Sequence, residues 1–294
     1  MPHTLLYFTA LLSLSTSSTW AKLNHMPSEV LGFWRMFIAA VLLTGWVFWY
    51  KKMPWPKFEK KLWWLVLSGV FFFLHLWSYK YAAKNTSIAN TMILFSTNPV
   101  WATAGSILLF NEKLTFRVIL AYILAIVGIV ILLYKQMHFH GQTLNGDMSA
   151  LISALFYSAF MLAGKKSRQL YPNLIVSNLQ YVVCAFLFLI VSFVINDSLA
   201  GYDRISWTAV IGQVLIPTFL GHFLMTYLVQ YMDLSLMTCG KLVEPIFAAI
   251  IAYFVFNETL HSESYIAFGL TATALLILFW PSVIKAISAN VNTR

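Results

Sequence analysis

Residues 98–114 read NPVWATAGSILLFNEKL, and residues 244–260 read EPIFAAIIAYFVFNETL. Each stretch opens with a polar residue and a proline, continues through ten mostly apolar residues, and closes on Phe-Asn-Glu-x-Leu. The two copies are 146 residues apart in a chain of 294 residues. This spacing of nearly half the chain indicates that the sequence is an internal duplication.

A second set of matches lies earlier in each half of the chain. Pro27 opens one apolar stretch and Arg35 follows eight residues later, while Pro172 opens another and Gln180 follows at the same interval. These residues are offset by 145 positions, nearly the offset of the first pair. Several matches at one offset indicate two related repeats.

The composition points to a lipid environment. Hydrophobic residues make up 60% of the chain and charged residues only 10%, whereas a soluble chain is about half apolar and a quarter charged. A membrane-spanning helix needs about 20 mostly apolar residues, and continuous apolar runs disfavour strands. We therefore predict an all-α polytopic membrane protein with ten transmembrane helices. The predicted spans are 4–22, 30–50, 62–82, 86–110, 115–135, 147–164, 174–195, 205–231, 236–257 and 262–284.

Five spans per repeat is an odd number, so the second repeat enters the membrane from the side opposite to the first. We predict two inverted five-helix repeats, the first in residues 1–138 and the second in residues 139–294. Inverted repeats are a common architecture of secondary transporters, which bind substrate near the midplane at the repeat interface.

The net charge of +9 is explained by membrane orientation, and we predict no nucleic-acid partner. Most of the 19 lysine and arginine residues fall on one side when both termini are placed in the cytoplasm, as the positive-inside rule requires. We counted Lys22, Lys80 and Lys84 among the external charges. Residues 5–21 lack a basic segment before them, so we expect a retained first span and no cleaved signal peptide.

The chain resembles the drug/metabolite transporter superfamily, specifically the ten-helix EamA-domain transporters. The resemblance rests on residues 27–35, on the two Pro-x10-Phe-Asn-Glu-x-Leu blocks, and on Gly221-His222 and residues 242–245. It implies a secondary transporter or exchanger that moves a small amphipathic metabolite, an amino acid or related amine, outward by alternating access. It also implies an integral protein of a bacterial inner (plasma) membrane, acting as a monomer or homodimer with protons as a candidate coupling ion.

Ionisable residues inside the spans are the first candidates for a substrate site, because each costs about 2.5–3.5 kcal/mol to insert. Lys241 and Glu244 are three residues apart and share a helix face, and Pro245 removes the donor for the Lys241 carbonyl. Either these side chains bind substrate, with Glu244 also carrying a proton, or they form a local ion pair in a kinked helix.

Asn98, Trp101 and Arg35 are further candidates for substrate binding. Asn98 and Trp101 are three residues apart, so we expect them on one face, where Asn98 bonds either substrate or a neighbouring helix. Arg35 lies eight residues inside its span and either attracts an anionic group or holds the fold together.

The mirrored third and eighth spans carry the remaining candidates, His75 with Tyr79 and His222 with Tyr227. Each histidine is either a proton relay or a ring hydrogen-bonded to a neighbour. The aromatic residues that we expect to line a cavity are Trp77, Tyr79, Trp101, Tyr157, Tyr181 and Tyr227.

The sequence contains no nucleotide-binding loop, metal-ligand cluster or nucleophile-elbow pattern. We therefore predict no enzyme activity, cofactor or metal. Two alternatives stay open: a membrane enzyme that uses His75, His222 and Glu244, and a lipid flippase.

Overall fold

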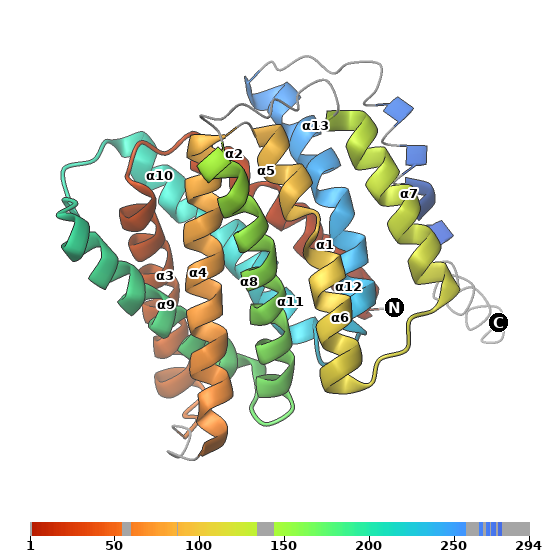
Figure 1. Ribbon diagram of the computed structural model, residues 1–294. Coiled ribbons are helices and arrows are strands. Elements are labelled where there is room, and N and C mark those ends of the chain that lie inside the picture. Colours follow the sequence, from red (N-terminus) through yellow and green to blue (C-terminus); the bar gives the residue numbers. More distant parts are fainter. Residues whose placement is uncertain are drawn as a thin grey trace, which may run out of the picture.

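The computed structural model describes residues 2–54, 60–86, 88–133 and 144–256, and short pieces between 265 and 277. In these residues the chain is helical, with no strand, and Figure 1 shows the helices gathered in one bundle. The α-helices are α1 (Pro2–Ser15), α2 (Ser17–Lys22), α3 (Ser28–Thr44), α4 (Trp63–Asn85), α5 (Ile88–Phe95), α6 (Asn98–Phe110), α7 (Phe116–Leu133), α8 (Leu144–Arg168), α9 (Asn173–Ile195), α10 (Arg204–Gln213), α11 (Leu224–Leu228), α12 (Leu234–Gly240) and α13 (Glu244–Phe256).

Three shorter helical pieces matter for the argument below. A π-helical turn, Gly45–Tyr50, extends α3, and a longer π-helical segment η5, Val214–Phe223, joins α10 to α11. A 3-10 turn η6, Lys241–Val243, joins α12 to α13. Each of these pieces continues the direction of its neighbours, so that several short helices together form one long segment.

Five of the described segments are long and apolar enough to cross a membrane, as expected for an integral membrane protein. They are Ser28–Tyr50, Leu144–Arg168, Asn173–Ile195, Arg204–Leu228 and Leu234–Val255. The first nine predicted spans each overlap described helices, whereas most of the tenth, 262–284, lies outside the described residues. The prediction of an all-helical membrane protein is therefore confirmed for the described residues, which form helices and include candidate membrane spans.

The two copies of the repeated sequence share a local structure. α6 begins at Asn98 and α13 begins at Glu244, which are the first residues of the two stretches. A shorter helix precedes each, namely α5 and α12, whose first residues are again 146 positions apart. Proline lacks the N–H that an uninterrupted helix needs. Pro99 and Pro245 therefore explain why both segments break just before these positions.

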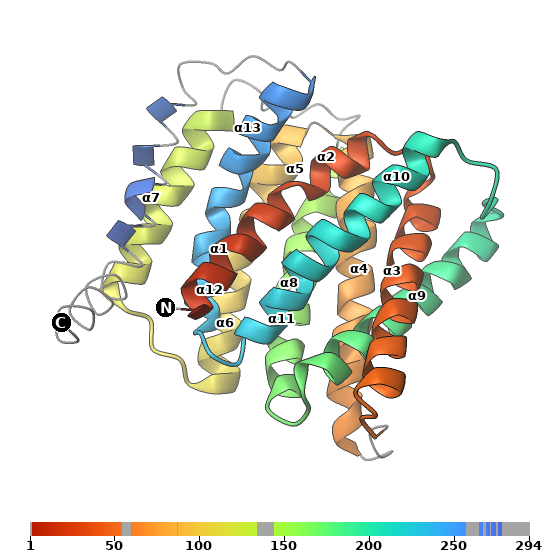
Figure 2. The same cartoon turned by 180° about the vertical axis from the view of Figure 1, so that it is seen from behind.

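The bundle has two faces and two edges. α4 packs against α8 on the face seen in Figure 1, and α1 packs against η5 on the face seen in Figure 2. α3 and α9 pack together at one edge, and α7 lies at the other edge. Of the interrupted segments, α5–α6 lies beside α8 on the face seen in Figure 1, and α12–α13 is in contact with α1. One buried core cluster contains residues from all of these elements.

Candidate functional site

Lys241 and Glu244 form an ion pair inside the protein. The Lys241 ammonium nitrogen lies 2.7 Å from a carboxylate oxygen of Glu244, and the two side chains are 3% and 13% exposed. Lys241 lies on the 3-10 turn and Glu244 opens α13. The interruption that Pro245 predicts is thus present, and it places both charges at the same break in the helix.

Aromatic rings enclose the Lys241 side of this pair. Its nitrogen lies 4.2 Å from the centre of the Tyr157 ring on α8 and 5.8 Å from that of Phe95 at the end of α5. Contacts between a cation and a ring of this kind contribute about 0.5–2 kcal/mol each. Phe95 occupies the position that matches Lys241 in the other repeat, 146 residues earlier. The two interrupted helices therefore meet at equivalent residues.

His75 connects this pair to α4. Its Nδ1 lies 2.9 Å from the Ser153 hydroxyl of α8, and the same hydroxyl donates to the His75 carbonyl at 3.1 Å. Its ring stacks on Phe95 at 5.4 Å and meets Tyr157 edge-on at 4.9 Å. His75 is thus held by a hydrogen-bonded neighbour and lies one ring away from Lys241.

His222 approaches from the opposite face of the bundle. It lies on η5, its ring centre is 6.3 Å from that of His75, and it meets Phe72 edge-on at 4.8 Å. Its Nδ1 is buried and has no hydrogen-bond partner among the described residues. The two histidines from mirrored spans are therefore brought together, in a setting that is mostly aromatic.

Asn98 and Trp101 are separated by the structure. Asn98 is 2% exposed, and its amide donates to the Phe95 carbonyl at 2.9 Å, which is the carbonyl that Pro99 leaves without a helical donor. Its Oδ1 is buried without a partner among the described residues. Trp101 is 46% exposed. Asn98 belongs to the centre, whereas Trp101 lies on the outer surface.

Arg35 is 1% exposed and connects α3 to η5. Its Nε donates to the Thr218 hydroxyl at 2.8 Å, and one of its terminal nitrogens donates to the Gln213 side chain at 3.4 Å. Pro217 lies inside η5 and cannot donate to the Gln213 carbonyl, so the Thr218 hydroxyl donates to it instead, at 2.7 Å. π-helical turns occur frequently at functional sites. Here the π-helical segment presents Thr218 to Arg35, and Gln213 at the end of α10 supplies the second polar side chain.

A cavity of about 270 Å³ lies between the N-terminal half of α3 and the C-terminal half of α4. Arg35, Tyr79 and Gln213 line it, together with Lys80, which is 5% exposed. We had counted Lys80 as an external charge, but it lies buried inside the bundle. The spacing of Leu76, Tyr79, Lys80, Ala83 and Lys84 along one helix face is the signal that identifies this wall.

Tyr79 links the cavity to the centre. Its ring lies 5.3 Å from that of Phe95 and 6.0 Å from that of His75. Tyr227 is not part of this group. Its ring is tilted against that of Tyr231, with centres 5.0 Å apart, and it lines a separate, open hollow beside Arg168. All nine candidates are thus located, and Trp101 and Tyr227 lie apart from the other seven.

Glu112 has a structural role at the end of α6. It pairs with Lys165 of α8 and accepts backbone hydrogen bonds from Leu234 and Ser235, at the start of α12. Burial raises the pKa of the Glu112 carboxyl, but the bonds from Lys165 and Leu234 outweigh burial and hold this pKa below its ordinary value. Glu112 therefore caps α12 and not the helix that follows it in the chain. Its counterpart Glu258 lies outside the described residues.

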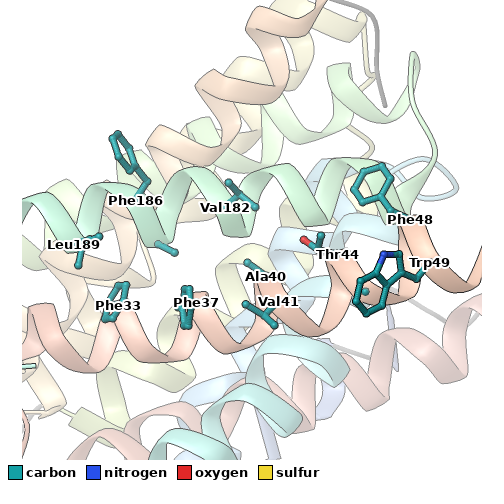
Figure 3. A pocket seen from close by; sticks show the side chains of 12 residues that line it. Phe33, Phe37, Ala40, Val41, Thr44, Phe48, Trp49, Val182, Phe186 and Leu189 are labelled. Carbon is teal, nitrogen blue, oxygen red and sulfur yellow. The ribbon is translucent and has the colours of Figure 1, made fainter. Parts of the chain in front are cut away.

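The α3–α9 edge carries a groove of about 590 Å³ that opens outward, shown in Figure 3. Its walls are apolar side chains such as Phe37, Val41 and Phe186, which are 41–61% exposed. The one hydroxyl in the lining, that of Thr44, accepts a hydrogen bond from Asn178 at 2.8 Å. This groove has the character of a lipid-facing surface and offers no charged group to a polar substrate.

Comparisons with known proteins identify the type of molecule. Residues 2–134 and 144–280 each match the EamA-like transporter family. A protein of Archaeoglobus fulgidus named an uncharacterized transporter is 26% identical over 214 residues, covering 71% of this chain and 73% of the relative. A second protein of that organism, with the same name, is 22% identical over 244 residues, covering 80% and 82%. A solved crystal structure of a protein superposes with a TM-score of 0.81 at 17% identity, over 95% of this chain and 98% of the other.

Proposed function

Because the chain belongs to the EamA-like transporter family, we propose that it is a secondary transporter or exchanger that works by alternating access. Its cargo is a small amphipathic metabolite, an amino acid or related amine, and the direction is export. The main observation in support of this proposal is that the two interrupted helices meet at a buried pair of opposite charges, Lys241 and Glu244. Interrupted helices at membrane depth are where such carriers bind substrate.

The proposed architecture is ten helices in two inverted repeats, residues 1–138 and 139–294. The pairing of elements supports a two-fold relation between the halves. α3 packs on α9, their first residues being 145 positions apart, and α4 packs on α8 as η5 packs on α1. Two nearly equal halves allow two arrangements of similar energy, each opening the centre to one side of the membrane.

The proposed substrate site is the central group of Lys241, Glu244, Asn98, His75 and Tyr79, with His222 and Arg35 at its borders. Rings hold the apolar part of the substrate, while Lys241 and Glu244 receive its charged groups. Protons are the proposed coupling ion, with Glu244 as their carrier. We place the protein in a bacterial inner membrane with both termini cytoplasmic, as a monomer or homodimer.

The test is transport by the full-length protein in liposomes. Labelled amino acids, amines, nucleotides and sugars are offered in turn, and we expect exchange of an amino acid or amine. Glu244→Gln and Asn98→Ala should reduce this exchange while the amount of protein in the membrane stays near normal. Covalent turnover of a substrate without movement across the membrane would contradict the proposal, and so would a preference for sugar phosphates.

A further inference from the structure

The cavity between α3 and α4 holds an unusual concentration of positive charge. Arg35 and Lys80 lie deep in its wall, at 1% and 5% exposure. Lys22 and Lys84 line the same cavity from exposed positions near its rim. The described residues that line it include no aspartate or glutamate. A cavity lined by one sign of charge concentrates the electric field on whatever enters it.

Two buried donors in the wall of this cavity lack an acceptor among the described residues. One terminal nitrogen of Arg35 and the amide nitrogen of Gln213 are buried without a hydrogen-bond partner among the described residues. Lys80 donates to the Ser28 carbonyl at the long distance of 3.5 Å and lies 5.2 Å from the centre of the Phe188 ring, and Lys84 donates to the Met26 carbonyl at 3.2 Å. Within the described part of the chain, no carboxylate forms an ion pair with Arg35, Lys80 or Lys84.

Glu29 is the acidic residue whose charge acts on Lys80 without forming an ion pair with it. Its carboxylate accepts a hydrogen bond from the Trp77 indole at 2.7 Å. Buried donors that lack an acceptor are rare in folded proteins and call for an explanation. Arginine and lysine offer donors and no acceptors, so the missing partner is a group with several acceptor oxygens.

We propose that this cavity binds an oxyanion, a carboxylate or phosphate, of a small amphipathic molecule. Arg35 and Gln213 donate to its oxygens, and Lys80 balances its charge. This inference rests on the proposed transport function in one respect: it takes the bound molecule to be the substrate that the protein transports. It narrows the substrate class to molecules that carry an acidic group and excludes simple amines.

The remaining walls fit the rest of such a molecule. Leu31, Leu76 and Tyr79 line the cavity beside the cations, and Tyr79 continues through Phe95 and His75 to the central ion pair. An anion held by Arg35 therefore has apolar and aromatic walls beside it for the rest of the molecule. At about 270 Å³ the cavity is close to the lower end of ligand pockets, about 300 Å³.

The test compares four probes that share a phenyl ring and differ in charge: phenylacetate, phenyl phosphate, L-phenylalanine and phenethylamine. Binding to the full-length protein in detergent is measured by calorimetry. We expect at least one of the three acidic probes to bind more tightly than phenethylamine, and the stronger of phenylacetate and phenyl phosphate identifies the oxyanion. Equal or tighter binding of phenethylamine overturns the proposal.

Variants locate the binding. Lys80→Gln and Arg35→Gln should each weaken binding of the preferred acidic probe by about tenfold to a hundredfold, the usual effect of losing a charged hydrogen bond. Lys80→Arg and Arg35→Lys keep the positive charge and should therefore retain part of the affinity for the acidic probe. Arg204→Gln, an exposed position at the start of α10, is the matched control and should bind like the wild type.

Lys84→Gln keeps the test decisive if the buried variants do not fold. This side chain is exposed, so its loss should leave the size-exclusion profile unchanged and weaken binding by about twofold to fivefold. Wild-type affinity in every cavity variant that folds overturns the proposal. Binding in detergent does not depend on transport across a membrane. Failure of the transport assay alone would therefore refute the proposed function without contradicting the proposed oxyanion site.

Discussion

The ion pair between Lys241 and Glu244 makes a quantitative prediction about single and double substitutions. The pair is 2.7 Å long and its side chains are 3% and 13% exposed. Lys241→Met or Glu244→Leu alone leaves one buried charge without its partner, which costs about 3–5 kcal/mol. Replacing both residues removes both charges with little change in volume, and such replacements are often neutral or stabilising.

The shift in melting temperature measures these changes in stability. One kcal/mol shifts the midpoint of a chain of about 250 residues by roughly 2 °C, so each single variant should melt roughly 6–10 °C below the wild type. The double variant should melt within about 2 °C of it. Intrinsic tryptophan fluorescence of the purified full-length protein follows the transition, and counterflow in liposomes is recorded on the same preparations.

Two results would refute this reasoning. Single variants that melt like the wild type would show that neither charge depends on the other. A double variant with normal transport would show that the ion pair has only a structural role. It would then indicate that the substrate site lies nearer His75 and His222.

Two further predictions concern the interrupted helices. Asn98→Ala removes the donor to the Phe95 carbonyl and should lower the melting temperature by roughly 2–6 °C, for a loss of about 1–3 kcal/mol, whereas Trp101→Ala on the outer surface should leave exchange near normal in the liposome assay. The folded pKa of Glu112 lies below its ordinary value of 4.5, so its contribution to stability is present above pH 4.5 and is lost as the pH falls through the folded pKa. Melting curves from pH 7 to 3 should therefore show a steeper loss for the wild type than for Glu112→Gln, and equal slopes would contradict the role of Glu112 as the cap of α12.

The sequence predicted the helices and their interruptions because both depend on local properties. Apolar runs of about 20 residues predict membrane-spanning helices from length and composition. The prolines at 99 and 245 interrupt a helix because they lack a backbone N–H, wherever the helix packs. The ion pair of Lys241 and Glu244 was likewise predicted as one alternative, because side chains three positions apart on a helix lie on the same face.

The cavity and the outer position of Trp101 could not be predicted in this way. Lys80 lies near the end of its span, and the packing of α4 against its neighbours places it inside, beside Ser28 of α3 and Phe188 of α9. Asn98 and Trp101 have helical spacing, but a difference of about 60° around the axis is enough to place one inside and the other outside. The π-helical form of η5, which contains Pro217, was not predicted from the sequence.

The inverted relation of the two halves is the claim on which the proposed mechanism depends, and labelling from one side of the membrane tests it directly. Single cysteines replace Lys51, which follows the second predicted span, and Asn196, which follows the seventh; both positions are exposed. Cys184 and Cys239, which are buried and free, are first changed to alanine. A maleimide that cannot cross membranes should label residue 196 on intact cells and residue 51 only after permeabilisation. Labelling of both residues from the same side would contradict the inverted architecture.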